Sequence, residues 1–198
     1  MKYSRFPLGT GSVLIISLLL SGCGIQSIPT ALNEVEATWS EVVNQYKRRS
    51  DLIPNLVNIV KGYASHEKET LQAVVEARAK ATQTQVSSGQ LIPETMNRFS
   101  QAQAGLGSAL SRLMVVVERY PDLKANENFR DLQVQLEGTE NRITIARQRY
   151  IQSIKEFNNL VTVPPTSWYN SLFLSHDKKP QFSVVDEAEI QQAPAVKF

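Results

Sequence analysis

Histidine and cysteine are nearly absent from this 198-residue chain, which holds two histidines and one cysteine. His66 and His176 stand more than a hundred residues apart. His66-Glu67 resembles the start of a zinc-protease helix, but no second histidine follows four residues on. A single cysteine excludes an intramolecular disulfide. We therefore expect no metal, no cofactor and a fold that is stabilised by packing alone.

Motifs of common enzymes are also missing. The sequence has no glycine-rich phosphate loop and no Gly-x-Ser-x-Gly elbow. Gly105 and Gly107 lie within a predicted helix, where we interpret them as close-packing positions. We expect no enzymatic activity, and a serine hydrolase using His66 or His176 is the remaining enzymatic alternative.

The chain also lacks a large excess of charge of either sign, with 21 Lys and Arg residues against 19 Asp and Glu. Two of the basic residues, Lys2 and Arg5, lie within residues 1–22, which contain no acidic residue. The chain from residue 23 onward therefore has 19 charges of each sign. Such a neutral chain has no global positive field, so we expect no nucleic-acid partner.

A short apolar run near the N-terminus indicates export. Residues 13–20 follow Lys2 and Arg5 and lead into Leu20-Ser21-Gly22-Cys23. The run is well below the roughly 18 apolar residues of a membrane-spanning helix. A basic start, an apolar stretch and small residues before a cysteine are typical of a bacterial lipoprotein signal, in which the thiol accepts a diacylglycerol group. An ordinary signal peptide, with Cys23 buried as a small hydrophobe, is the alternative.

The signal predicts the processing and location of the chain. Residues 1–22 are the cleaved lipoprotein signal peptide, and residues 23–30 are a linker anchored by acyl chains such as palmitate on Cys23. Several acyl chains bind a membrane effectively permanently. The exported protein then belongs to the cell envelope. Gly24 rather than an aspartate follows the cysteine, which favours the outer membrane, facing the periplasm, in a bacterium with two membranes.

Apolar residues recur at alternating steps of three and four through most of the chain, which predicts long helices packed at small crossing angles. We expect a seam in each of three segments, formed by Leu32, Val35, Trp39, Val42, Tyr46, Ile53, Leu56, Val60 and Tyr63, by Phe99, Leu106, Leu110, Leu113, Val117 and Tyr120, and by Phe129, Leu132, Leu136, Thr139, Ile143, Ala146, Tyr150, Ile154, Phe157 and Val161. No segment alternates with the period of two that a half-buried strand shows. The fold class is therefore all-α.

Helix lengths suggest the architecture. Pro93 suits a first helical turn, Asn126 suits an N-cap, and Pro121 and Pro164 end helices. A helix over residues 31–84 would be about 80 Å long and would overhang its partners unless it broke at Pro54 or Gly62. Because the seam keeps its phase through Pro54, we expect one long helix, bent near Pro54, whose Ser50 carbonyl loses its helical partner. The expected fold is an up-and-down bundle of three to four long helices over residues 31–163.

The C-terminal segment, residues 164–198, has a different character. The segment contains four prolines, Pro164, Pro165, Pro180 and Pro194, and its aromatic residues have no helical period. The segment is too apolar for a free disordered tail. We expect an extended strap that lays its aromatic side chains across the bundle, and a partner-binding or membrane-contacting peptide is the alternative.

One polar cluster stands out as a candidate interaction site or structural cluster, namely Arg48, Arg49, Asp51, Asn55, His66 and Glu67. Arg49 occupies a seam position, so its guanidinium must reach a carboxylate or extend to solvent. We expect it to be buried and paired, and we expect Arg48, Asp51 and Asn55 to hold the bend at Pro54. A ligand-binding role for the cluster is the alternative.

The sequence resembles the LemA family over roughly residues 30–198. The resemblance lies in Lys47-Arg48-Arg49-Ser50-Asp51-Leu52-Ile53-Pro54-Asn55-Leu56-Val57, Val60-Lys61-Gly62-Tyr63-Ala64, His66-Glu67, Tyr120-Pro121-Asp122-Leu123-Lys124-Ala125-Asn126-Glu127-Asn128-Phe129, Thr139-Glu140-Asn141, Ala146-Arg147 and Tyr150. It implies a helical bundle associated with the bacterial envelope and without established enzymatic activity. Family members are often described with an N-terminal membrane-spanning segment, whereas this chain has the Cys23 signal, so that topology does not carry over.

Two functional hypotheses follow. The first is a non-enzymatic, membrane-tethered scaffold or adaptor for another envelope protein. The second is a sensor that binds a small ligand or a peptide, through the region of Arg49, Asp51 and His66 or through a groove under the aromatic C-terminal segment.

Overall fold

The computed structural model describes residues 26–84 and 86–182, which fold almost entirely as helices. Four helices are long: α2 (Ser27–Tyr63), α3 (Lys68–Gln83), α4 (Pro93–Val117) and α6 (Glu127–Thr162). The remaining elements are short, namely η2 (Ser88–Gln90), α5 (Pro121–Ala125), α7 (Thr166–Tyr169) and the π-helical η3 (Asn170–Leu174). No strand occurs in either described range, so the all-α prediction is confirmed. Within these two ranges the α-helices number six rather than three to four, because the short α5 and α7 add to the four long helices.

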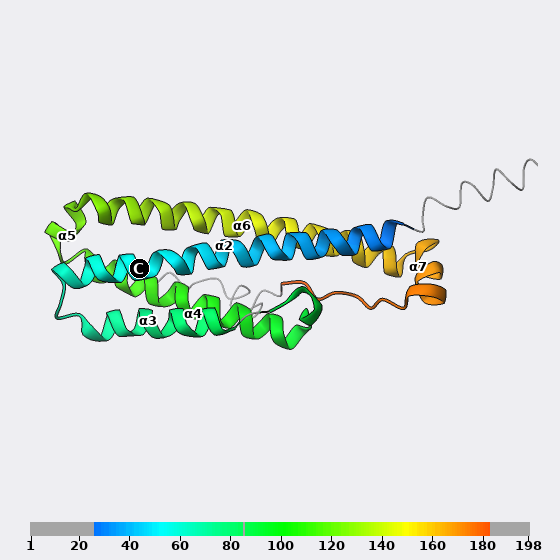
Figure 1. Cartoon of the computed structure of the whole chain (residues 1–198), viewed down its shortest axis with the longest axis horizontal. Helices are drawn as coiled ribbons and strands as arrows, with labels where there is room; N and C mark the ends of the chain where they lie inside the picture. Colours follow the sequence, from blue (N-terminus) through cyan, green and yellow to red (C-terminus); the bar gives the residue numbers. More distant parts are fainter. Residues whose placement is uncertain (1–25, 85, 183–198) are drawn as a thin grey trace, which may run out of the picture.

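The four long helices run alternately up and down along one axis (Figure 1). α2 lies beside α6 over its length, and α3 lies beside α4. The helix boundaries have local causes that the sequence shows. Pro93 begins α4, and the Asn126 side chain accepts a hydrogen bond of 3.0 Å from the Phe129 amide at the start of α6. α2 begins at Ser27, so residues 27–30 are helical rather than a linker.

The predicted seams are the buried faces of these helices. Every seam residue predicted for α6 is buried, from Phe129 to Val161. In α2 the buried series includes Arg49 together with the apolar positions around it. Only the ends of the first two seams differ, because Leu32 and Tyr120 are half-buried and Tyr63 is exposed.

The expectation of one long first helix is wrong. α2 ends at Tyr63, directly after Gly62, and a short turn leads to α3 at Lys68. The break falls there because α3 must reverse direction to pack against α2 and α4. The apolar period continues on both sides of the turn, with Ala64 and Leu71 buried. Periodicity alone therefore did not reveal the break.

α2 continues through Pro54 because another helix replaces the lost hydrogen bond. Proline has no amide hydrogen, so the Ser50 carbonyl has no donor four residues on. Arg78 of α3 supplies it, with Nε donating to the Ser50 carbonyl oxygen at 2.9 Å. Asp51 binds Lys47 at 2.9 Å, one turn back on α2. A side chain from a different helix thus does what we expected of Arg48, Asp51 and Asn55.

The C-terminal segment is extended only in part. Residues 166–174 form α7 and η3, and residues 175–182 follow without helix or strand. The extended part is tied to α6 because the Asn158 side chain bonds both the amide and the carbonyl of Lys179. Phe182 then packs on Trp39 and Tyr150, with ring centroids 6.0 and 5.4 Å away. The rest of the predicted strap, residues 183–198, lies outside the described residues.

Candidate functional site

A layer of polar side chains crosses the bundle and divides its hydrophobic core in two. One apolar cluster includes Ile53, Leu106 and Leu136, and the other includes Tyr46, Phe99 and Ile143. Between these sets lie Arg49 on α2, Gln103 on α4 and Thr139 on α6, all buried. Such a layer fixes how the helices align, because a shift would bury its polar groups without partners.

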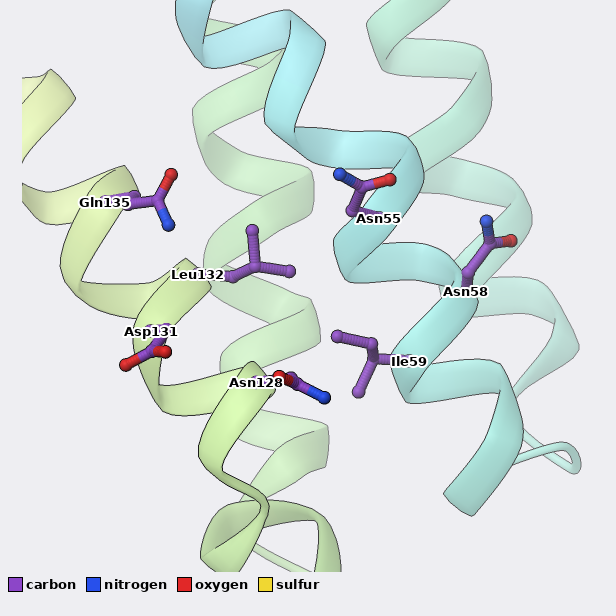
Figure 2. A pocket seen from close by; sticks show the side chains of 7 residues that line it. All are labelled: Asn55, Asn58, Ile59, Asn128, Asp131, Leu132 and Gln135. Carbon is purple, nitrogen blue, oxygen red and sulfur yellow. The ribbon is translucent and has the colours of Figure 1, made fainter.

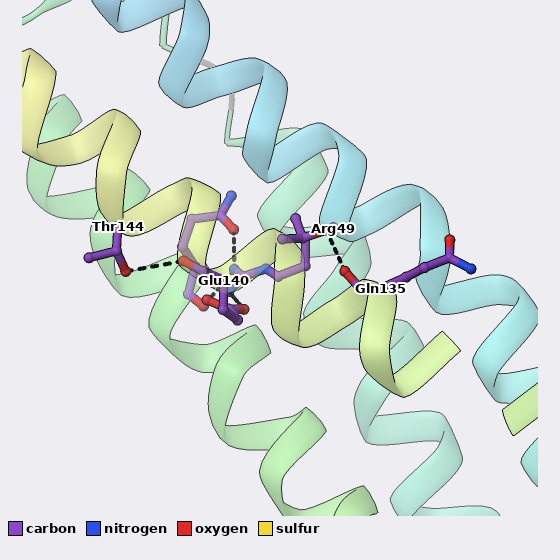
Figure 3. A network of polar contacts seen from close by, with 6 residues as sticks. Arg49, Gln135, Glu140 and Thr144 are labelled. Atoms are coloured by element: carbon purple, nitrogen blue, oxygen red, sulfur yellow. Dashed lines mark hydrogen bonds and ion pairs between the residues drawn. The ribbon is translucent and has the colours of Figure 1, made fainter. Parts of the chain in front are cut away.

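Arg49 is the centre of this layer (Figure 3). Its Nη1 donates to Glu140 Oε1 at 2.6 Å, and its Nη2 donates to Gln103 Oε1 at 2.7 Å. Gln103 Nε2 in turn donates to the Ala81 carbonyl at 3.4 Å. The guanidinium also lies 5.1 Å from the centroid of the Tyr46 ring. One arginine thereby connects all four long helices.

The two partners of the ion pair differ in exposure. The Arg49 side chain is 5% exposed, whereas that of Glu140 is 51% exposed. Arg49 is therefore buried and paired, as the seam predicted, and does not extend to solvent. Its Nε is buried and has no hydrogen-bond partner in the described part of the chain.

A surface groove opens above this layer, between α4 and α6. It consists of two adjoining hollows of about 400 and 380 Å³, both lined by Arg49, Gly107 and Glu140. Further lining residues come from α4 and α6, namely Ser100, Ala104, Ser111, Met114, Gln133, Glu137, Thr144 and Arg147. We call this feature the α4–α6 groove. Small side chains form much of its α4 wall, and polar or charged ones form most of its α6 wall.

Gly105 and Gly107 are not close-packing positions. A Cβ atom added at either would meet no atom within 4 Å. Gly107 instead lies where the two hollows join. It keeps the middle of the groove open although a glycine inside a helix costs about 1 kcal/mol relative to alanine.

The other members of the predicted polar cluster lie away from Arg49. Arg48 is exposed, and Asp51 is exposed and paired with Lys47. Asn55 lines a separate hollow of about 410 Å³ between α2 and α6. Figure 2 shows its amide among those of other residues at this hollow, including Asn58, with Asp131 opposite on α6.

His66 and Glu67 lie in the turn between α2 and α3. His66 is exposed. Glu67 Oε1 accepts hydrogen bonds from Arg119 Nη2 at 3.0 Å and from the Tyr120 hydroxyl at 2.9 Å. The bond from Tyr120 to Glu67 raises the pKa of the tyrosine hydroxyl, since the bond requires its proton. Glu67 thus ties this turn to the end of α4.

The segments that resemble the LemA family meet in space. Arg49 of the first segment binds Glu140, and Tyr63 accepts a hydrogen bond of 3.0 Å from Asn126. The resemblance therefore reports contacts between helices. Gln103 was missed by sequence analysis, although the gap between Phe99 and Leu106 in the predicted seam marks its position.

Two buried tyrosines, Tyr46 and Tyr150, belong to the apolar cluster on one side of the polar layer. Burial raises the pKa of the Tyr46 hydroxyl, an effect that the cations of Arg147 and Arg49 reduce. Burial also raises the pKa of the Tyr150 hydroxyl well above its usual range. Among the described residues the Tyr150 hydroxyl has no hydrogen-bond partner. Both tyrosines therefore stay protonated at neutral pH.

Within residues 26–84 and 86–182, no three His, Cys, Asp or Glu side chains are placed to hold a metal ion. None of the helices in these ranges combines the length and the apolar character that crossing a membrane requires. Cys23, the predicted lipidation site, and the predicted signal peptide over residues 1–22 lie outside the described residues.

The fold and site define a class of protein: an antiparallel helical bundle with a buried arginine layer beneath an open groove. Comparison with known families identifies the class. The LemA family model matches residues 38–198, so the chain belongs to the LemA family.

Curated relatives are more distant in sequence. Magnetosome protein MamQ 1 of Paramagnetospirillum magneticum is 23% identical over 170 residues, which cover 77% of this chain and 62% of that protein. Magnetosome protein MamQ of Magnetospirillum gryphiswaldense is 24% identical, with 69% and 56% covered. Protein LemA of Metamycoplasma hominis is 23% identical, with 70% and 58% covered. The chain thus spans less than two thirds of the length of these relatives.

Proposed function

We propose that this LemA-family chain is a non-enzymatic scaffold or adaptor, tethered to the membrane by lipid on Cys23, that holds another envelope protein in the α4–α6 groove. In a bacterium with two membranes it is anchored in the outer membrane and faces the periplasm. The signal-like sequence before Cys23 supports the tether. Two relatives are named as magnetosome proteins, and neither of these names gives a reaction.

The α4–α6 groove is the observation that carries this proposal. On α4 it extends from Ser100 to Met114, a length of about 21 Å. Such a length accommodates about four turns of a partner helix. Small side chains on the α4 wall allow a backbone to approach closely, while Glu137 and Arg147 offer polar contacts on the α6 wall.

Filling the groove tests the proposal without disturbing the bundle. Gly107→Leu places a side chain where the two hollows meet, and the new Cβ meets no atom within 4 Å. Replacing a helical glycine also favours the helix. Gly138→Leu is the matched control, because Gly138 is an exposed, equally unobstructed glycine on α6 that does not line the groove.

The measurement is photo-cross-linking in the bacterium, with a photoreactive amino acid at Ser111 of the full chain. We expect one discrete cross-linked protein that persists with Gly138→Leu and is lost with Gly107→Leu. A cross-link that survives Gly107→Leu, or no cross-link at all, would contradict the proposal.

A second candidate function is a sensor that binds a small anion in the same groove. It is favoured by Arg49 Nε, which has no hydrogen-bond partner among the described residues, and by Arg147 nearby on the α6 wall. Native mass spectrometry of the chain purified from its bacterium distinguishes the two functions. A small molecule that is retained by the parent chain and by Gly138→Leu, and is lost with Gly107→Leu, supports the sensor.

A further inference from the structure

Large apolar side chains are exposed together just beyond the end of α6. Trp168, Leu172 and Phe173 are 65%, 76% and 71% exposed, and Val163 is 54% exposed. They belong to α7, η3 and the link that precedes them. We call these four residues the apolar tip. Exposed apolar clusters of this kind mark surfaces that contact a membrane or another molecule.

The fold holds these side chains outward. In the same short helices, Tyr169 and Leu174 pack against the hydrophobic core, and the Phe173 ring lies 5.0 Å from the ring of Tyr169. The buried Asn170 side chain donates to the His176 carbonyl and accepts from the His176 amide, both at 3.0 Å. The chain reverses at Ser175, whose φ is 54° and whose amide donates to the Asn170 carbonyl at 2.7 Å. These contacts therefore fix the conformation of the segment that carries the apolar tip.

The apolar tip lies at the end of the bundle where α2 begins (Figure 1). Ile28, in the first turn of α2, belongs to the apolar cluster on which Tyr169 and Leu174 pack. Cys23 precedes Ser27 by four residues, so the chain between them spans at most about 14 Å. A lipid on Cys23 thus holds this end of the bundle close to the bilayer.

The chemistry of the apolar tip matches a membrane interface. Tryptophan is favoured at the level of lipid headgroups, and leucine and phenylalanine insert into the acyl boundary. Lys178 is exposed and Lys179 is half-buried, five and six residues after Phe173, and the acid beside them, Asp177, is exposed. Lysines at such a position attract anionic headgroups.

We propose that the apolar tip inserts into the headgroup and acyl boundary of the lipid bilayer beside the Cys23 anchor, so that the bundle stands on the membrane by this end. This inference rests on the lipid anchor proposed above. It adds a second point of membrane contact and with it a fixed orientation, which leaves the flank that carries the α4–α6 groove accessible to a partner.

Tryptophan fluorescence tests the contact directly. The chain has two tryptophans, and Trp39 is only 2% exposed in the core, so Trp168 reports on the tip. The processed full chain is reconstituted into vesicles of phosphatidylethanolamine and phosphatidylglycerol, with or without bromine on the acyl chains. We expect brominated lipid to reduce the Trp168 signal at least twofold, and the remaining Trp39 signal of Trp168→Phe to be unchanged.

A matched variant tests the orientation. Val134 is 67% exposed on α6, and about 42 Å of helix separates it from the end of α6. In the Trp168→Phe background, Val134→Trp should escape quenching if the bundle stands on its tip. Equal quenching at both positions overturns the proposal, because the bundle would then lie flat.

Flotation of the same vesicles separates the two proposals. If the chain does not float with lipid, the anchor and the tip contact both fail. If it floats and brominated lipid leaves the Trp168 signal unchanged, only the tip contact fails. That result, combined with a cross-link from position 168 to a protein, would assign the tip to a protein partner instead.

Discussion

Arg49 and Glu140 have unequal access to water, and this inequality sets the effect of removing either one. Arg49→Leu leaves behind a carboxylate that is already half exposed, together with the buried amide oxygen of Gln103, which loses its donor. An unpartnered buried amide costs about 1–3 kcal/mol. This loss is smaller than the cost of leaving a buried charge without its partner, which is about 3–5 kcal/mol.

Removing the exposed partner is expected to cost more. Glu140→Leu leaves the guanidinium of Arg49 buried without its carboxylate, which costs about 3–5 kcal/mol. Urea unfolding of both variants beside the parent chain measures the difference. Equal losses, or a larger loss for Arg49→Leu, would show that the pair is not asymmetric in solution.

Tyr150 offers a second test at the residue scale. Its buried hydroxyl has no partner among the described residues, so Tyr150→Phe should stabilise the protein by about 1 kcal/mol. Its raised pKa adds a pH dependence. Above about pH 10 the unfolded chain loses this proton while the folded chain keeps it, so stability falls as pH rises.

The comparison across pH isolates Tyr150 from the other tyrosines. Above about pH 10, the free energy of unfolding should decline less steeply for Tyr150→Phe than for the parent, by about 1.4 kcal/mol per pH unit. Chemical unfolding between pH 7 and about pH 11 provides the two curves. Parallel curves would contradict the raised pKa, because the hydroxyl would then ionise equally in the folded and the unfolded chain.

At the scale of elements, α3 supplies the hydrogen bond that α2 lacks at Pro54. Arg78→Met removes the donor to the Ser50 carbonyl and should cost about 1–2 kcal/mol. Pro54→Ala restores a backbone donor, so Arg78→Met should cost about 1 kcal/mol less in that background. A double-mutant cycle measures this coupling. Lys80→Met, which changes an exposed cation on the same helix, serves as the control and should stay within about 0.5 kcal/mol; zero coupling would contradict the assignment.

Much of the arrangement of the helices could be predicted from the sequence. The seams of α2, α4 and α6 followed from apolar spacing, and Asn126 and Pro93 marked helix starts correctly. Arg49 could be singled out because a charge in a seam needs a partner. The turn between α2 and α3 follows Gly62, which the sequence offered as a possible break, but the apolar period persists across the turn and favoured one continuous helix.

Other features depend on contacts that a one-dimensional pattern does not contain. Arg78 lies 28 residues from Ser50, and no local signal connects the two. The α4–α6 groove exists because α6 packs on α2, and α4 on α3, so that small residues of α4 are left facing α6. The outward display of Trp168 and Phe173 depends on the Asn170–His176 hydrogen bonds.

At the scale of the whole molecule, the end and the flank of the bundle have different proposed tasks. The end where α2 begins carries the apolar tip and lies close in sequence to Cys23. The α4–α6 groove lies along the flank, above the Arg49 layer. A tether at the end and a groove on the flank are the arrangement that a membrane-bound adaptor needs.

The lipid on Cys23 is the central claim, because the location, the orientation and the scaffold role all depend on it. Mass spectrometry of the N-terminal peptide, from the chain purified out of bacterial membranes, tests it most directly. We expect a peptide that begins at Cys23 and carries a diacylglycerol on sulfur and a further acyl chain on its amino group. A peptide that retains residues 1–22, or an unmodified Cys23, would rule out the lipid anchor.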